Sequence, residues 1–342
     1  MIAENADYYI DGVLEGNRRV IAKTITLVES SLPAHQEKAK TIIDNLLPYS
    51  GEAVRIGITG IPGVGKSAFI ESFGMMLLKD DHRIAVLAVD PSSKKSGGSV
   101  MGDKTRMERL SVEECAFIRP SPSGGTLGGV ARKTRETMIV CEAAGFDVII
   151  VETVGVGQSE TTVASMVDFF LVLMLSGAGD ELQGIKKGVL ELADAITITK
   201  TDGDNIEKAK RARKEYETAL HLINPSSANW LPPVTTCSAI KFEGMENIWN
   251  IILNHRDKLK SNGEFEEKRK NQSIEWMWSL VEEGLKDQFY KNTDVKTMLP
   301  KVKKEVEKGK MAPTAAAFKL LSFFSHKGVS SSTGSNRRHN DF

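Results

Sequence analysis

The chain has 342 residues, enough for one large domain or two smaller ones, and its 45 basic residues balance its 45 acidic residues. That balance argues against a broad nucleic-acid-binding surface, although a local basic patch remains compatible with it. A hydrophobic fraction of 41% is ordinary for a soluble protein, and no uninterrupted apolar run is long enough to cross a bilayer.

The cysteines point to a reducing compartment. Cys115, Cys141 and Cys237 lie far apart and form no C-x-x-C pair, so the sequence predicts neither a disulfide framework nor a zinc site. The first residues lack the apolar core of a secretory signal and the arginines of a transit peptide. We expect the cytoplasm, or the mitochondrial matrix if the source is eukaryotic.

The first two thirds of the chain predict helices followed by an α/β core. Residues 7–47 carry apolar side chains near helical spacing, with a break at Pro33 and a second helix over 35–47. Continuous apolar strands separated by helices predict a mostly parallel sheet covered on both faces, the α/β class of P-loop proteins. Strands are expected at residues 54–59, 83–89, 115–119, 147–152, 168–175, 195–200 and 234–238, with helices at 68–78 and 130–144.

The last third predicts helices throughout. Apolar residues recur at helical steps over 245–259, 274–289, 295–306 and 315–323, and the charge-rich stretch 260–272 is predicted to connect the first two. An extended arm of this kind needs a partner for its apolar stripe. That partner is a second copy of the chain or the chain's own core. The expected domains are an N-terminal helical segment (1–50), a nucleotide-binding domain (51–260), a C-terminal helical dimerisation arm (261–326) and a disordered tail (327–342).

The strongest motif is the run GIPGVGKS at residues 60–67, which fits the phosphate-binding pattern G-x-x-x-x-G-K-[ST] at every fixed position. It lies between a predicted strand and a predicted helix, as the motif requires. The glycines let backbone amides surround phosphate oxygens, and the helix N-terminus favours the same anion. Lys66 is expected to reach the β- and γ-phosphates, and Ser67 is expected to bind Mg²⁺. The alternative is that the run is an ordinary glycine turn between a strand and a helix.

Three acidic residues are candidates for the same metal ion. Glu152 ends a predicted strand in an E-x-x-G pattern, Asp90 ends another, and Asp103 follows in a loop. Carboxylate oxygens at one edge of a sheet suit Mg²⁺. The alternative is that one of them, Asp103 above all, is a helix cap. Gln158 is a candidate for orienting the attacking water.

The residues TKTD at 199–202 predict a guanine site. Asp202 can accept from both the ring N–H and the amino group of guanine, a donor pair that adenine lacks, and the stem of Lys200 can cover the ring. Thr199 replaces the Asn of the usual N-K-x-D pattern, which weakens the match. The loop after the last strand is expected to offer an amide to the base. The predicted nucleotide contacts are Gly60, Ile61, Pro62, Gly63, Val64, Gly65, Lys66, Ser67, Ala68, Lys200, Asp202, Ser238, Ala239 and Ile240.

Several further motifs carry a family resemblance. They are GIPGVGKS (60–67), DPSS (90–93), SGGS (96–99), GDKTRM (102–107), RPSP (119–122), ETVGVGQSE (152–160) and GDELQGIK (179–186). With them the chain resembles the methylmalonyl-CoA mutase-associated GTPases, the MeaB/ArgK group whose eukaryotic members are called MMAA. The resemblance covers residues 7–325.

That resemblance implies a homodimeric P-loop GTPase that uses GTP/GDP and Mg²⁺. It implies a chaperone of the adenosylcobalamin-dependent mutase, which gates delivery of cobalamin from the adenosyltransferase and protects or rescues the mutase. By the same resemblance, residues 90–106 are switch I and residues 154–165 are switch II. Residues 175–186 are then a third switch toward the mutase, with Asp180 and Lys186 at the matching positions.

Two other functions stay open from the residues alone. A P-loop also serves small-molecule kinases, because the same motif supports phosphoryl transfer to a bound acceptor. A metal-insertion GTPase is the other possibility, although the chain lacks the His/Cys cluster that handling a soft metal needs.

Overall fold

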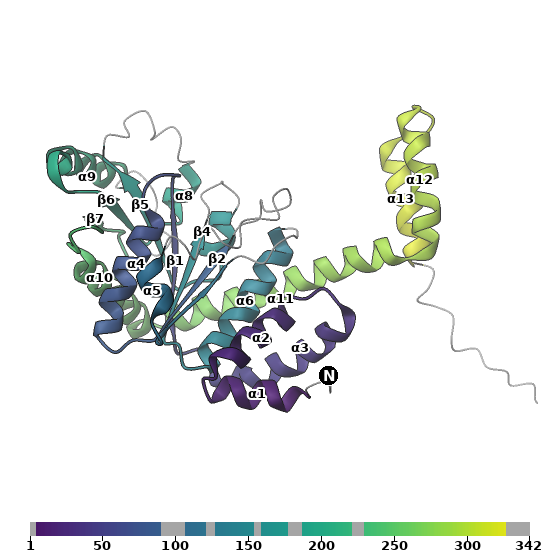
Figure 1. Cartoon of the computed structure of the whole chain (residues 1–342). Helices are drawn as coiled ribbons and strands as arrows, with labels where there is room; N and C mark the ends of the chain where they lie inside the picture. The colour runs from purple at the N-terminus through teal and green to yellow at the C-terminus, as the bar shows by residue number, and fades with distance from the viewer. Residues whose placement is uncertain are drawn as a thin grey trace, which may run out of the picture. The chain divides into compact units, whose positions relative to one another are not determined.

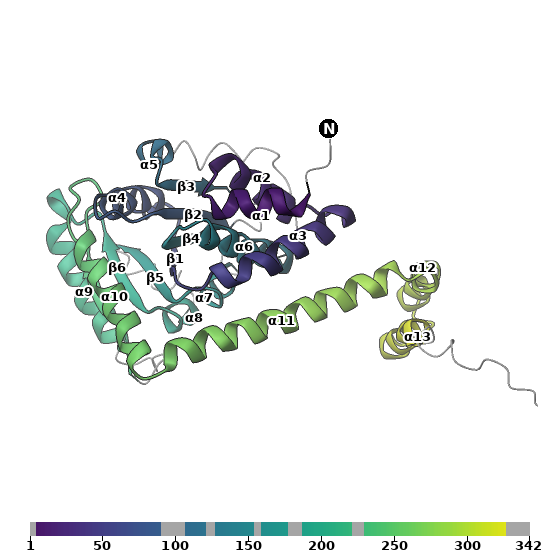
Figure 2. The ribbon, with the colours of Figure 1, turned by 90° about the horizontal axis from the view of Figure 1, so that it is seen from below.

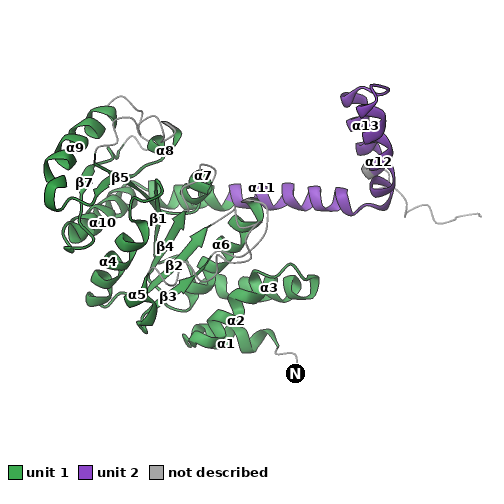
Figure 3. Ribbon diagram, turned by 45° about the horizontal axis from the view of Figure 1, so that its top comes forward, with its two compact units in different colours: residues 1–273 green, residues 274–342 purple. Residues whose placement is uncertain are grey.

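The computed structural model of the chain describes residues 5–89, 107–120, 127–153, 159–176, 187–220 and 229–325 (Figure 1). The chain forms two compact units, residues 1–273 and residues 274–342 (Figure 3). None of the helices in the described part of the chain is both long and apolar enough to span a membrane. The predicted tail at 327–342 lies outside the described residues.

Three helices open the first unit, α1 (Ala6–Leu14), α2 (Arg18–Val28) and α3 (Pro33–Leu46). The sequence predicted one helix before Pro33, and the structure has two. Gly16 adopts a left-handed conformation with φ of 71°, and the Asn17 side chain accepts hydrogen bonds from two amides of the first turn of α2. A left-handed glycine followed by an N-cap ends one helix and starts the next.

A parallel sheet in the order β3-β2-β4-β1-β5-β6-β7 forms the centre of the first unit (Figure 1). Every strand pairing in the described residues is parallel, which confirms the predicted α/β fold. All strands therefore end at one edge, where ligands of such sheets bind. The strands are β1 (Val54–Gly60), β2 (Ile84–Val89), β3 (Ala116–Arg119), β4 (Val148–Thr153), β5 (Phe169–Leu175), β6 (Ala195–Thr199) and β7 (Val234–Thr236).

Helices cover both faces of this sheet, as Figures 1 and 2 show. On one face α4 (Lys66–Lys79) and α10 (Met245–Ser261) bury their apolar sides against the central strands in one hydrophobic core. On the other face lie α6 (Leu127–Ala143) and α7 (Ser159–Ala164). Burial on both faces explains why strands such as β5 are apolar at consecutive positions. Helix α9 (Ile206–Leu220) lies beside β6 and β7. The shorter elements are η1 (Leu47–Tyr49), α5 (Glu108–Val112), α8 (Lys187–Glu191) and η4 (Gly203–Asn205).

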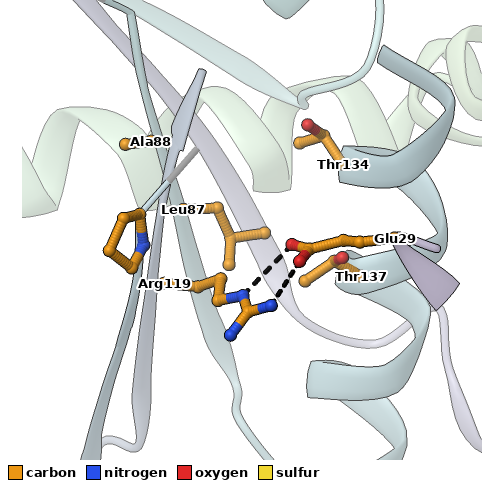
Figure 4. Close-up of a pocket in the computed structure, with 7 residues that line it drawn as sticks. Glu29, Leu87, Ala88, Arg119, Thr134 and Thr137 are labelled. Carbon is orange, nitrogen blue, oxygen red and sulfur yellow. Dashed lines mark hydrogen bonds and ion pairs between the residues drawn. The ribbon is translucent and has the colours of Figure 1, made fainter. Parts of the chain in front are cut away.

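The N-terminal helices are tied to the sheet by an ion pair, shown in Figure 4. Glu29 caps the C-terminus of α2, and Arg119 ends β3. The Arg119 Nε atom donates to Glu29 Oε1 at 3.1 Å, and Nη2 donates to the other carboxylate oxygen. With Thr134 and Thr137 of α6 they line a cavity of about 10 Å³, room for roughly one water molecule.

The C-terminal helices begin earlier than the sequence predicted. Helix α11 (Glu264–Lys291) already includes most of the stretch 260–272 that was predicted to be a connection. Its charged residues do not mark a linker, because two of them, Lys268 and Arg269, bind acceptors directly before β1 and β5. In the second unit, α12 (Thr293–Glu307) and α13 (Pro313–Ser325) pack side by side around Val295 and Val302.

Candidate nucleotide site

The phosphate-loop motif connects the end of β1 to the start of α4. Gly60 lies so close to β5 that a Cβ atom there would be 2.6 Å from the Leu173 carbonyl oxygen. Gly63 and Gly65 have φ of 83° and 93°, in the left-handed region that side chains other than glycine rarely adopt. The glycines of the motif are therefore required by the shape of this loop, and Gly65 leads directly into the N-terminus of α4.

Lys66 lies over its own loop. Its Nζ atom donates to the Gly60 carbonyl oxygen at 2.7 Å and lies 3.5 Å from the Ile61 carbonyl oxygen. A phosphate oxygen carries more charge than a neutral carbonyl and accepts a stronger hydrogen bond from a lysine. The ammonium group is thus held beside the N-terminus of α4, where an anion is favoured. Ser67 is the next residue and is half-buried.

Thr199 connects the loop to the neighbouring strand β6. Its hydroxyl donates to the Val64 carbonyl oxygen at 2.7 Å and lies 3.3 Å from the Met174 carbonyl oxygen. Thr199 is 4% exposed and Val64 is fully buried, so this bond is shielded from water. The sequence singled out Thr199 only as a departure from N-K-x-D. The structure gives it a hydrogen bond that fixes the middle of the phosphate loop.

Lys200 reaches the same loop from the next position. It is a non-glycine residue with φ of 57°, and its Nζ atom donates to the Gly63 carbonyl oxygen at 2.8 Å. The side-chain Cε atom would lie 3.8 Å from a Cβ atom at Gly65. A left-handed conformation costs a lysine roughly 1 kcal/mol or more. Here it directs the aliphatic stem across the loop, as covering a base requires.

Asp202 and Ser238 meet at the carboxyl ends of β6 and β7. The Ser238 hydroxyl donates to Asp202 Oδ2 at 2.6 Å, and Ser238 is fully buried. The Ser238 amide donates to the Glu243 carbonyl oxygen, so the following amides at Ala239 and Ile240 are the ones to consider for a ligand. The Ala239 carbonyl oxygen accepts from Ser72 of α4 at 2.8 Å, which links this loop to the helix of the phosphate loop.

Glu152 lies at the end of β4, between β1 and β2. It pairs in register with Ile58 and with Ala88 and is 9% exposed. The next residue, Thr153, donates its hydroxyl to the Thr59 hydroxyl at 2.7 Å, just before the phosphate loop begins. This places the carboxylate at the same sheet edge as the loop.

The donor set fits a Mg²⁺ ion that is held mainly by a nucleotide. Within the described residues no group of three or more His, Cys, Asp or Glu side chains could hold a metal by itself. Mg²⁺ in nucleotide sites keeps several waters and takes only one or two protein oxygens besides the phosphates. Ser67 and Glu152 are oxygen donors at this edge and meet that requirement.

Five of the predicted site residues lie outside the described residues. They are Asp90, Asp103, Gln158, Asp180 and Lys186. The structure brings together the phosphate loop, the residues 199–202 and the loop after β7. Ser72 was not predicted, because it reads as an ordinary helix residue. Its partner, the Ala239 carbonyl, is 167 positions away and has no local sequence signal.

Comparison with known proteins agrees with this geometry. The model of the family described as methylmalonyl Co-A mutase-associated GTPase MeaB matches residues 21–294. A putative GTPase of Caulobacter vibrioides is 53% identical over 312 residues, covering 91% of this chain and 95% of that protein. The mitochondrial methylmalonic aciduria type A homolog of Mus musculus is 44% identical over 328 residues, covering 93% of this chain and 79% of that protein.

A solved structure agrees as well. A crystal structure described as an LAO/AO transport system kinase superposes with a TM-score of 0.75 at 39% identity, covering 93% of this chain and 97% of that one. The family resemblance stated from the motifs is thereby confirmed, and with it the prediction of a P-loop GTPase. The chain belongs to the methylmalonyl-CoA mutase-associated GTPase family.

Proposed function

We propose that this GTPase is a chaperone of adenosylcobalamin-dependent methylmalonyl-CoA mutase. It gates loading of the cofactor and protects or reactivates the mutase. The proposal rests on membership of a family that is described by its association with that mutase. The observation that carries the nucleotide part is the convergence of Thr199, Lys200 and Asp202 on the phosphate loop and the loop after β7.

The phosphate loop and α4 hold the triphosphate in this proposal. Lys66 exchanges its bond to the Gly60 carbonyl for the β- and γ-phosphates. A bound Mg²⁺ neutralises phosphate charge, and Ser67 and Glu152 supply its protein oxygens. Asp90 and Asp103 are further proposed metal contacts and Gln158 the proposed water-orienting residue, and Lys66, Glu152 and Gln158 together are the proposed catalytic group.

Guanine is the proposed base. Asp202 accepts from Ser238 through one carboxylate oxygen, which fixes the carboxylate at the sheet edge. Asp202 is half-buried. When a bound base covers its carboxylate without offering the paired donors of guanine, the carboxylate stays unsatisfied, so adenine is rejected. Changing Asp202 to Asn turns one acceptor into a donor and should shift preference from GTP toward xanthosine triphosphate. Competition binding with GTP, ATP and xanthosine triphosphate tests this, and an unchanged preference would count against the assignment.

The homodimer is proposed from α11 and the helices after it. Ile274, Met277, Val281 and Leu285 recur on one side of α11, and each is at least 43% exposed. Such an exposed stripe is stabilised when a second apolar surface covers it. A second copy of the chain can supply that surface, because symmetric dimers are the commonest oligomers. The mutase, by way of Asp180 and Lys186, and a cobalamin adenosyltransferase are the other proposed partners. A reducing cytoplasm or mitochondrial matrix is the proposed compartment, in keeping with three free cysteines.

The test is GTP turnover with and without a cobalamin-dependent mutase. We expect the mutase to stimulate hydrolysis in the intact protein, and Lys66→Ala to abolish turnover in both conditions because the phosphate contact is lost. Lys186→Ala should keep the intrinsic rate and lose the stimulation. Radioactive phosphate appearing on a metabolite instead of in solution would support a kinase and contradict the chaperone.

A further inference from the structure

The first turns of α11 are bound to the short segment 165–168 that joins α7 to β5. This segment ends at Asp168, whose carboxylate is 3% exposed and accepts two hydrogen bonds from Arg269, at 2.8 and 2.7 Å. The Asp168 carbonyl oxygen accepts from Lys268 at 2.7 Å. Arg269 also donates to the carbonyl oxygens of Gly51 and Ala53, at the start of β1. The first turns of α11 are therefore fixed to the residues directly before the two central strands β1 and β5.

A second set of contacts joins the first turns of α11 to the residues that directly follow α7. Arg135 of α6 donates through Nη2 to the Ser165 carbonyl oxygen at 2.8 Å and to the Ser165 hydroxyl at 3.0 Å. Its Nη1 atom donates to the Gln272 carbonyl oxygen in α11 at 3.3 Å. Gln272 completes the ring, because its Nε2 atom donates to the Val167 carbonyl oxygen at 2.9 Å. We call Arg135, Ser165, Val167 and Gln272 the α7–α11 junction.

Helix α7 is in turn packed against the strand that leads into the phosphate loop. Gly57 of β1 has no side chain, and a Cβ atom there would lie 2.9 Å from a methyl group of Val163 and 3.0 Å from one of Val167. The chain enters α7 from β4, whose tip carries Glu152. Helix α7 therefore follows the strand that carries Glu152 and precedes the junction, so a shift at the nucleotide site when the nucleotide changes would be passed on to α7.

We propose that the α7–α11 junction couples the nucleotide bound at the phosphate loop to the conformation of the first turns of α11. Arg269 and Lys268 bind Asp168, Gly51 and Ala53, which directly precede the strands β5 and β1, and act as a fixed pivot. Arg135 and Gln272 bind Ser165 and Val167, which directly follow α7, so a displacement of α7 reaches α11 through them. The coupling is reciprocal. If the nucleotide changes the affinity of a partner for the first turns of α11 by some factor, binding of that partner changes the affinity for the nucleotide by the same factor.

The chemistry of Arg135 suits this role. A planar guanidinium presents several donors in a fixed fork and can hold two separate segments at once, whereas a lysine ammonium is a point charge. Gln272 and Val167 are both buried, so a variant that lacks the Gln272 amide leaves the Val167 carbonyl oxygen without that donor. Arg135 is accordingly a positioning residue, and it touches no nucleotide group in this proposal.

The experiment is hydrogen–deuterium exchange of the full chain with GDP and with a non-hydrolysable GTP analogue, both with Mg²⁺. In the wild-type protein the amides of residues 264–273 should exchange at rates that differ at least about fivefold between the two nucleotides, the lower end of typical coupling. Arg135→Lys and Gln272→Met should each reduce that difference to within about twofold while both nucleotides still bind. Ser165→Ala, which removes one of the two acceptors at that residue, should give an intermediate loss.

A matched control lies three residues away on the same helix. Arg132 pairs with Glu136 at 3.1 Å, and Arg132→Lys should leave the nucleotide dependence of exchange intact. The proposal is overturned if residues 264–273 exchange equally in both nucleotide states of the wild type. It is also overturned if the difference survives in both Arg135→Lys and Gln272→Met. The measurement needs no mutase, so its outcome is independent of the proposed chaperone function.

Discussion

Replacing Thr199 by Val tests whether its hydroxyl holds the phosphate loop in place. The two side chains have nearly the same shape, so the substitution removes the donor to the Val64 carbonyl oxygen at 2.7 Å and little else. Both residues are buried, and a buried carbonyl that loses its partner costs about 1–3 kcal/mol. The free energy of unfolding should fall by about that amount.

Nucleotide affinity should fall as well, but by less. The bond holds the loop in place before any ligand binds, so its loss lowers the fraction of protein with a binding-competent loop. If that fraction falls to between about one third and one tenth, the GDP dissociation constant rises about three- to tenfold. Urea unfolding and isothermal titration with GDP and Mg²⁺ measure the two quantities separately.

The chain offers a matched control on the same strand. Thr197 is also fully buried, and within the described residues its hydroxyl has no hydrogen-bond partner. Thr197→Val therefore removes a buried hydroxyl without breaking a bond, and it should leave stability and GDP affinity unchanged or improved. Thr199→Ser, which keeps the donor, should bind GDP almost normally. Equal stability and GDP affinity of Thr199→Val and Thr197→Val would show that the Thr199 hydroxyl does not hold the loop.

Two further predictions follow from buried titratable groups. Asp194 directly precedes β6 and is 4% exposed, and its carboxylate lies 3.6 Å from Lys268 Nζ and 3.5 Å from Nε2 of His255 in α10. Burial alone would raise the pKa of Asp194, but Lys268 and His255 outweigh it and hold that pKa below its usual range. The stabilisation is therefore complete above about pH 4, the usual pKa of Asp, and disappears as the pH falls further. Asp194→Asn should lower the free energy of unfolding by about 3 kcal/mol at pH 7. In a series of urea unfolding curves, the variant should also lose less of its urea midpoint than the wild type as the pH falls below about 4. Burial raises the pKa of the Cys237 thiol to about 12, so a thiol reagent should modify exposed Cys115 quickly and the two buried cysteines only on unfolding.

Much of the fold could be predicted because its signals are local. Strands such as β4 and β5 are apolar at consecutive positions, which two covered faces require. The phosphate loop has fixed residues at fixed spacing, and its glycines have conformations that only glycine adopts readily. Both kinds of signal lie within fewer than ten residues of sequence.

The predictions failed where the deciding contact was distant or the local signal was weak. The start of α11 was missed because its charged residues looked like a linker. Lys268 and Arg269 instead bind Asp168, about 100 positions earlier. The break at Gly16 was missed because a lone glycine within an apolar period is weak evidence against a helix. Arg135 carries no motif, and the coupling role proposed for it rests only on its contacts to Ser165 and Gln272.

In the proposed site the phosphate loop, with Lys66 and a divalent ion, binds the triphosphate of a guanine nucleotide. The decisive experiment is calorimetric titration of the purified protein with GTP or GDP in the presence of Mg²⁺, with ATP and Lys66→Ala as controls. We expect saturable heat from guanine nucleotides, far weaker binding of ATP, and the loss of GTP binding in the variant. Absence of heat from guanine nucleotides, or equal binding by Lys66→Ala, would contradict the proposed site.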